Sequence, residues 1–135
     1  VYGPRQRPDL AIYKFTHLIS EGRPVPMFGD GTTARDYTYI TDIINGVMAV
    51  TQKEFGFRIF NLGESQTVTL RYLIELLEKA LGKKATIERH PPQPGDVPIT
   101  FANIGKARSL LGYSPSVKIE QGIPMFVEWF RQRHK

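Results

Sequence analysis

Residues 25–40 read Val-Pro-Met-Phe-Gly-Asp-Gly-Thr-Thr-Ala-Arg-Asp-Tyr-Thr-Tyr-Ile and decide the fold. A short apolar run leads to a tight turn at residues 29–31, and Arg35 then heads an alternating aromatic segment. The alternation of Tyr37 and Tyr39 with polar residues predicts a strand with one buried face. The turn sets a backbone loop beside an arginine, which suits an anionic, planar ligand such as a nucleotide diphosphate.

The glycines of this stretch also match a loose dinucleotide-binding pattern, Gly29-x-Gly31-x-x-Ala34. That pattern has meaning only when it opens a helix inside a strand–turn–helix unit. The residues that follow are β-like instead, so we interpret the glycines as a sharp turn between two strands.

The composition is that of a globular domain. A chain of 135 residues can enclose one core, and it has no apolar run of membrane-spanning length. It has no cysteine, which excludes disulfides and zinc–thiolate sites and fits a cytoplasmic protein. The three histidines are scattered, so no metal site is predicted. The net charge of +5 favours a solvated basic surface over nucleic-acid binding, because no basic helix or aromatic array accompanies it.

The order of predicted elements gives an α/β fold class. Helical apolar spacing predicts helices over residues 10–21, 41–52, 70–81, 104–111 and 119–133. We expect Asp9 to cap the first helix and glycines to end the first, third and fourth. Strands are predicted over residues 57–62 and 85–89, and the first of these lacks polar alternation, as in a strand covered on both faces.

Two proline-bracketed loops present polar side chains in a defined geometry. Residues 1–8 carry Arg5 and Arg7, either of which could clamp an anion or a sugar or simply face solvent. Residues 90–98 contain four prolines and present Gln93 and Asp96. No Tyr-x-x-x-Lys pair, phosphate loop, His-Glu-x-x-His or Gly-x-Ser-x-Gly occurs, so the residues offer binding groups and no catalytic group is predicted.

Five short motifs together resemble a known family. They are Val-Tyr-Gly-Pro-Arg-Gln-Arg-Pro-Asp (1–9), Phe-Gly-Asp-Gly (28–31), Arg-Asp-Tyr-Thr-Tyr-Ile (35–40), Phe-Asn-Leu-Gly (60–63) and Gln-Pro-Gly-Asp-Val (93–97). In this order and spacing they resemble the C-terminal part of extended short-chain dehydrogenase/reductases acting on nucleotide sugars, with UDP-glucuronate 4-epimerases as the nearest subtype.

The resemblance implies a small, mixed substrate-binding lobe plus C-terminal elements of a Rossmann-type domain. The N-terminal Rossmann half, with the glycine-rich loop that binds most of the NAD and with the catalytic Tyr and Lys, would precede Val1 and be missing from this chain. The whole of residues 1–135 would be the substrate-binding part. Residues 41–63 would pack on the missing half, so the chain alone should expose apolar surface. The resemblance also implies that the parent enzyme can form a homodimer.

The resemblance also implies how a UDP-sugar would be held. Arg35 would clamp the diphosphate, with Tyr37 beside it. The backbone around Met27 and Phe28 would hold the uracil, and Asp96 would accept hydrogen bonds from the ribose hydroxyls.

Three further positions receive roles from the same resemblance. Arg7 would contact the substrate and help to select an acidic sugar. Lys14 is a weaker substrate-binding candidate. Val1 would lie near the nicotinamide of NAD.

The implied reaction is NAD-dependent epimerisation at C4 of UDP-glucuronate, giving UDP-galacturonate through a 4-keto sugar, and this chain alone would be inactive. Gln93 stands where galactose-type epimerases tend to carry arginine, which argues against that type or at least moves one phosphate contact elsewhere. A UDP-glucuronate decarboxylase or another UDP-sugar epimerase or dehydratase stays an alternative. So does a free-standing nucleotide-sugar-binding module without catalysis.

Overall fold

The computed structural model describes residues 1–134 and contains five helices and four short strands. The helices are α1 (Ala11–Ser20), α2 (Ile40–Thr51), α3 (Leu70–Leu81), α4 (Gly105–Leu111) and α5 (Ile119–Arg133). The strands are β1 (Val25–Phe28), β2 (Ala34–Asp36), β3 (Thr67–Thr69) and β4 (Ile87–His90). Among these residues, no helix combines the length and the apolar character that crossing a bilayer requires.

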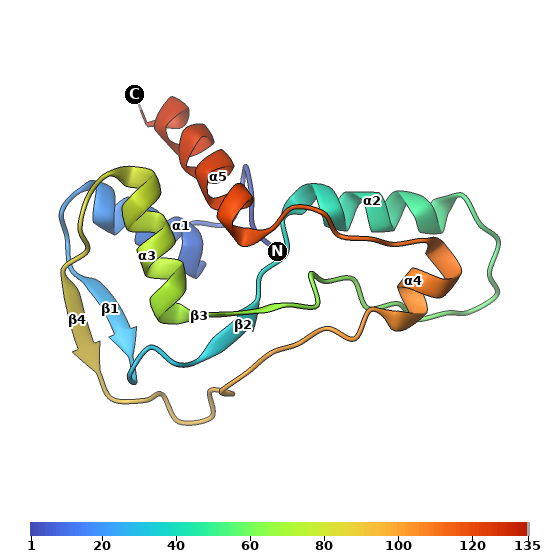
Figure 1. Cartoon of the computed structure of the whole chain (residues 1–135), viewed down its shortest axis with the longest axis horizontal. Coiled ribbons are helices and arrows are strands. Elements are labelled where there is room, and N and C mark those ends of the chain that lie inside the picture. The colour runs from blue at the N-terminus through green and yellow to red at the C-terminus, as the bar shows by residue number, and fades with distance from the viewer. Residues whose placement is uncertain (135) are drawn as a thin grey trace.

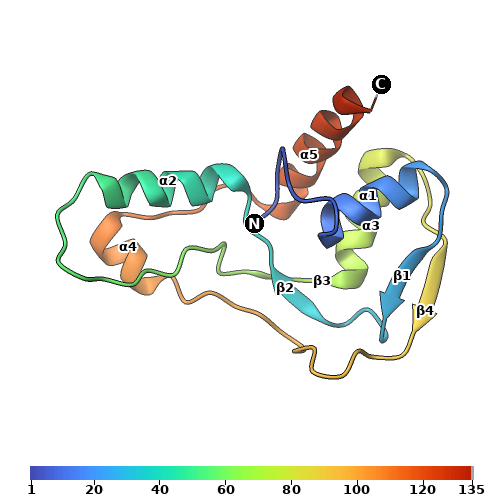
Figure 2. The same cartoon turned by 180° about the vertical axis from the view of Figure 1, so that it is seen from behind.

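The molecule has a larger and a smaller end. Figures 1 and 2 show α1, α3, α5, β1 and β4 gathered at one end, with α2 and α4 at the other and long irregular segments between them. The larger end holds the main core, in which Ile12, Leu73, Ile123 and Phe126 are almost fully buried. A separate small core around α4 includes Ala107.

The strands form two small sheets. β1 pairs with β4 in parallel, with Val25 opposite Ile87 and Phe28 opposite His90. β2 pairs with β3 in antiparallel orientation. The predicted mixed α/β class is confirmed, and the glycine-rich segment is a turn between two strands, as interpreted from the sequence.

The helices follow the sequence closely. α3 and α5 have the predicted limits, and Gly82 and Gly112 end α3 and α4 in the left-handed conformation with φ of 69°. The prediction that Asp9 caps α1 is wrong: the cap residue is Leu10, which makes no side-chain cap bond. The Asp9 carboxylate instead accepts two hydrogen bonds from the side chain of Arg7.

The strand predicted from the alternation of Tyr37 and Tyr39 with polar residues is only partly correct. β2 stops at Asp36, and Thr38 and Tyr39 are both buried although they are neighbours. The reason is a long-range bridge: the Tyr2 N–H donates to the Thr38 carbonyl (2.9 Å), and the Ile40 N–H donates to the Tyr2 carbonyl (2.9 Å). The chain turns into α2 there, so simple alternation of faces ends.

The predicted buried strand over residues 57–62 is wrong for this structure. The segment is irregular, and Phe57 and Ile59 are 80% and 66% exposed. It pairs with no strand within residues 1–134, so its backbone lacks the ladder that would make it a strand.

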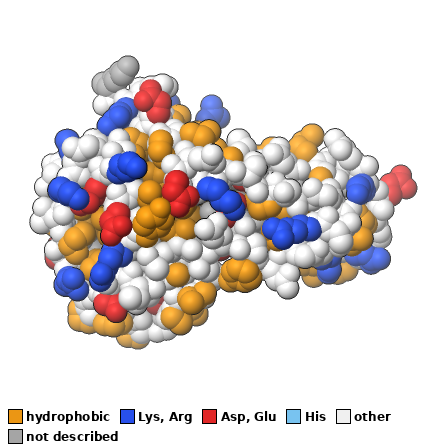
Figure 3. Space-filling model, viewed as in Figure 1, with side chains coloured by type: hydrophobic (Ala, Val, Ile, Leu, Met, Phe, Trp, Pro, Cys, Tyr) orange, Lys and Arg blue, Asp and Glu red, His pale blue; other side chains and the backbone are white. Residues whose placement is uncertain are grey.

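α2 presents its apolar side chains to the surface. Ile44, Val47 and Met48 are each about half exposed, at 49%, 46% and 52%. Its buried residues are Asp42 and Gly46. The expected exposure of apolar surface over residues 41–63 is therefore observed, and Figure 3 shows hydrophobic side chains at the surface of this smaller end.

A single carboxylate connects three distant segments in the middle of the molecule. Asp36 accepts hydrogen bonds from the backbone N–H groups of Glu64, Ser65 and Ala102, each at 3.0 Å. Gly63 lies so close to Ala102 that an added Cβ would come within 2.4 Å of the alanine methyl. Asp36 with its three hydrogen bonds, here called the Asp36 hub, thus fixes the segments after residues 60 and 100 against β2.

Candidate ligand-binding site

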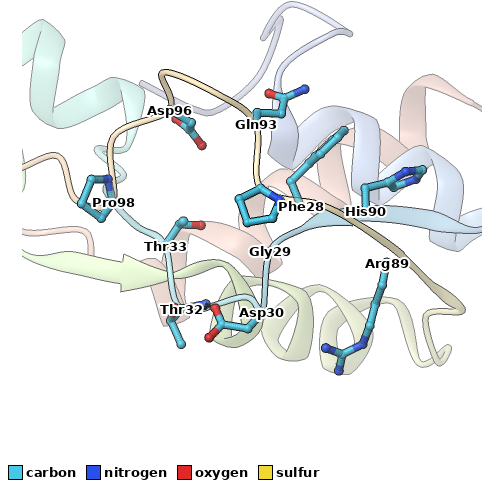
Figure 4. A pocket seen from close by; sticks show the side chains of 11 residues that line it. Phe28, Gly29, Asp30, Thr32, Thr33, Arg89, His90, Gln93, Asp96 and Pro98 are labelled. Carbon is cyan, nitrogen blue, oxygen red and sulfur yellow. Dashed lines mark hydrogen bonds between the residues drawn. The ribbon is translucent and has the colours of Figure 1, made fainter.

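Two adjoining hollows lie beside the end of β1. The larger, of about 700 Å³, opens between the turn after β1 and the proline-rich loop after β4 (Figure 4). The smaller, of about 380 Å³, is lined by residues that include Lys14, Arg35 and Tyr37. The two share Phe28, Thr33, Gln93 and Asp96 as lining residues, so together they form one extended site.

The turn that forms one wall of the larger hollow has a constrained backbone conformation. Gly29 and Gly31 have φ of 72° and 84°, values that favour glycine. The Asp30 carboxylate accepts from both the N–H and the hydroxyl of Thr32, which lowers the pKa of Asp30. The Gly29 N–H donates to the His90 carbonyl at 2.9 Å and so ties the turn to β4.

Arg35 and Asp96 meet directly where the two hollows join. Arg35 Nη2 lies 2.6 Å from Asp96 Oδ1, and their side chains are 27% and 44% exposed. Arg35 Nη1 also donates to the Ala34 carbonyl at 2.9 Å, which holds the guanidinium in place. Arg35, assigned to the diphosphate, and Asp96, assigned to the ribose, therefore lie in direct contact. An anion that enters the site would compete with Asp96 for Arg35.

Lys14 and Tyr37 line the smaller hollow with Arg35. Burial raises the pKa of Tyr37, although the nearby Arg35 opposes this, so the phenol stays a neutral hydrogen-bonding group near neutral pH. Lys14 forms no ion pair with any residue in the described part of the chain, 1–134. This leaves its ammonium group available to an anion.

Met27 and Phe28 face different ways, as neighbours in a strand do. The Met27 side chain is 4% exposed and belongs to the main core, so only its backbone can face a ligand. Phe28 lines both hollows. The structure therefore brings Phe28 together with Lys14, Arg35 and Asp96.

Arg7 and Val1 line neither of these hollows. Arg7 donates from Nε and Nη2 to the two oxygens of Asp9, at 2.7 and 2.8 Å, and Asp9 itself lines the smaller hollow. Val1 is 61% exposed and lies in a separate hollow of about 470 Å³, which Phe60 and Phe101 also line.

Sequence reasoning assigned no role to His90, which lines the larger hollow. The sequence feature that could have identified His90 is its position, directly after a predicted strand and at the start of the proline-rich loop. Within residues 1–134, no group of three or more His, Cys, Asp or Glu side chains is arranged to hold a metal ion. The site combines cations, a carboxylate and aromatic rings, which suits a ligand with phosphate, hydroxyl and planar parts.

The chain is similar to proteins of known family. The family model described as GDP-mannose 4,6 dehydratase matches residues 1–126. A UDP-glucuronate 4-epimerase of Thermodesulfobacterium geofontis is 43% identical over 133 residues, which cover 98% of this chain and 41% of the relative.

Solved structures share the fold. The UDP-glucuronic acid 4-epimerase from Bacillus cereus, in complex with UDP-glucuronic acid and NAD, is 37% identical with a TM-score of 0.91 over 98% of this chain and 43% of its own. The UDP-glucose 4-epimerase of Thermotoga maritima with UDP-glucose is 33% identical, with a TM-score of 0.92 over 99% and 44%. This chain thus spans less than half the length of the relatives that it matches.

Proposed function

This chain belongs to the GDP-mannose 4,6 dehydratase family, and on that premise we propose that it is the substrate-binding part of an NAD-dependent nucleotide-sugar 4-epimerase. The proposed substrate pair is UDP-glucuronate and UDP-galacturonate. The observation that carries the proposal is the meeting of Arg35 and Asp96 at the junction of the two hollows, 2.6 Å apart. A guanidinium and a carboxylate at that point match the diphosphate and the ribose diol of one ligand.

The other site residues complete this assignment. Lys14 adds a second cation to the smaller hollow, where the diphosphate and the sugar would lie, and Tyr37 offers a neutral hydroxyl there. The backbone of Met27 and Phe28, at the end of β1, would border the uracil. Arg7 uses Nε and Nη2 for Asp9, which leaves the Nη1 hydrogens for a sugar carboxylate.

Only the region around Val1 would contact NAD in this chain. Val1, exposed in the hollow of about 470 Å³ with Phe60 and Phe101, is the residue that would border the nicotinamide. The cofactor, when bound, would supply reversible hydride acceptance at C4 of the sugar. The residues of this chain anchor the nucleotide, so that the sugar can turn over while the nucleotide stays bound.

The apolar surface of α2 and residues 57–59 is the proposed contact with the Rossmann half of the enzyme. Ile44, Met48 and Phe57 are among its exposed members. A surface of this kind is unusual unless another protein surface covers it. We expect this chain alone to bind the nucleotide without turning the sugar over.

Isothermal titration with UDP tests the proposal. Arg35→Ala should weaken UDP binding about tenfold or more, since it removes a charge-assisted contact. Arg23→Ala is the matched control, because Arg23 is an exposed arginine that pairs with Glu21 outside the site. Equal affinity of both variants for UDP would contradict the proposal.

Product analysis separates the possible reactions. UDP-glucuronate is incubated with NAD and the enzyme that contains this chain, and the nucleotide sugars are identified by NMR. UDP-galacturonate is the expected product. A UDP-pentose would instead identify a decarboxylase, and unchanged substrate would favour a binding module.

A further inference from the structure

The paired strands β1 and β4 have a second face, which points away from the rings of Phe28 and His90. Met27 lies opposite Arg89 in the parallel pairing, and Ile87 precedes Arg89 by two residues, so these three side chains share that face. Figure 4 shows Arg89 extending away from Phe28 and His90. A cleft of about 200 Å³ lies on this second face, bordered by β4 and by the first two turns of α3.

The floor of the cleft is apolar. Met27 and Ile74 line it and are buried, and Ile87 beside them is 37% exposed. A cavity of about 150 Å³ with such walls is large enough to bind benzene. The cleft therefore has room for a ring or a branched chain that carries one further polar group.

Two guanidinium groups line the same cleft. Neither Arg71 nor Arg89 forms an ion pair with any residue of the described range 1–134. Arg71 Nη2 donates to the Asp30 carbonyl at 3.0 Å, and the Arg71 N–H donates to the Gly31 carbonyl at 3.1 Å. These bonds hold Arg71 in place and leave its Nε and Nη1 for a ligand. A guanidinium held in this way suits a carboxylate, which can accept two parallel hydrogen bonds.

Two glutamates also line the cleft and limit the charge that it accepts. Glu78 already accepts hydrogen bonds from Lys84 Nζ and from the Ala85 N–H, both at 2.8 Å. Glu75 follows Arg71 by one turn of α3 and forms no ion pair within residues 1–134. Its negative charge would repel a second negative charge on a ligand, so a singly charged carboxylate suits the cleft better than a phosphate group.

We propose that this cleft binds a small carboxylic acid with an apolar body. The carboxylate would lie on Arg71 and Arg89, and the ring or branched chain would cover the apolar floor. The proposal goes beyond the function proposed above, because the side chains that carry it hold no part of the nucleotide in that assignment.

Titration with benzoate, followed by NMR of the backbone amides, tests the proposal. Benzoate should shift the signals around the cleft in a saturable way, and benzamide, which has the same shape without the charge, should bind at least about tenfold more weakly. Arg89→Met keeps most of the apolar stem and removes the charge, so it should weaken benzoate binding about fivefold. Arg108→Met is the matched control, because Arg108 is an exposed arginine on α4 without an ion pair in the described residues.

A change that adds affinity separates a direct charge effect from damage to the fold. Glu75→Gln removes the repelling carboxylate and should tighten benzoate binding about two- to threefold. Unchanged or weaker binding by this variant would contradict the placement of the carboxylate beside α3.

Arg35 also offers a guanidinium to benzoate, so the two positions must be separated. Excess UDP should leave benzoate binding unchanged, and Arg35→Ala should bind benzoate as the wild type does. Displacement of benzoate by UDP, or its loss in Arg35→Ala, would place it in the two hollows and overturn the proposal. Equal affinities for benzoate and benzamide, or no saturable shift at millimolar benzoate, would also overturn it, and neither result bears on the binding of UDP.

Discussion

Replacement of Asp36 by asparagine tests the physical account of the fold most directly. The Asp36 carboxylate accepts three backbone N–H bonds of 3.0 Å, one on Oδ1 from Glu64 and two on Oδ2 from Ser65 and Ala102. Asparagine has almost the same shape but only one acceptor oxygen. The amide can therefore keep either the two bonds to Oδ2 or the single bond to Oδ1.

The cheaper arrangement keeps its oxygen at the Oδ2 position and places the NH₂ group against the Glu64 N–H. It loses one charge-assisted bond and leaves one donor unpaired, which costs about 1–3 kcal/mol of the free energy of unfolding. Asp36→Ala loses all three bonds and should cost more, about 3–6 kcal/mol at a similar cost per group. Since many domains have only about 5–15 kcal/mol of stability, the alanine variant should unfold readily.

Urea unfolding, monitored by circular dichroism, measures these losses. Glu54→Gln removes an exposed carboxylate that forms no ion pair in the described residues, and it should change stability by no more than about 0.5 kcal/mol. If Asp36→Asn is as stable as this control, the three bonds do not hold the segments together and the reasoning is refuted.

Three further predictions concern other parts of the molecule. Gly122→Ala should destabilise the protein by about 1–3 kcal/mol in the same urea assay, because the new Cβ would lie 1.9 Å from the buried Tyr2 hydroxyl; wild-type stability would contradict this. Lys14→Ala should weaken UDP binding severalfold and make it less sensitive to salt, and an unchanged salt dependence would exclude Lys14 from the site. Burial raises the pKa of Tyr113 from 10.0 to about 12, so the stability that this neutral phenol contributes is present below pH 10 and is lost as the pH rises through 12. Tyr113→Phe should lose this alkaline dependence, and an identical pH profile in both proteins would contradict the assignment.

The sequence predicted the elements whose signals are local. α3 and α5 combine helical apolar spacing with clear limits, and α3 also has a glycine that ends it in the left-handed conformation. Residues 57–62 carry an equally clear apolar signal, but a strand needs a neighbouring strand, and none pairs with it within residues 1–134. The apolar signal therefore indicates that this segment favours burial, but it does not determine whether the segment forms a strand.

The residues of the candidate site were predictable only in part, since Arg7 and Val1 line neither of its hollows, and their arrangement was not predictable. Motif resemblance assigned Arg35 to a diphosphate and Asp96 to a ribose, yet their contact joins positions 61 residues apart. No local pattern encodes that distance. The position of His90 was not predicted for the same reason: it depends on the parallel pairing of β4 with β1, which places its ring on Phe28.

β2 connects the stability of the fold to the ligand site. Arg35 and Asp36 are neighbours in this strand, and successive side chains of a strand point to opposite faces. Arg35 therefore faces the junction of the hollows, where it meets Asp96, while Asp36 accepts the bonds that hold the segments after residues 60 and 100. β2 is also held by its pairing with β3 and by the backbone hydrogen bonds of Ala34 with Pro98 and Thr100, and the Asp36 hub adds a further constraint on the direction of Arg35. Asp36→Asn should accordingly weaken UDP binding at temperatures where the variant is fully folded, whereas Glu54→Gln should not. Wild-type affinity in a folded but destabilised Asp36→Asn would show that the hub and the site are independent.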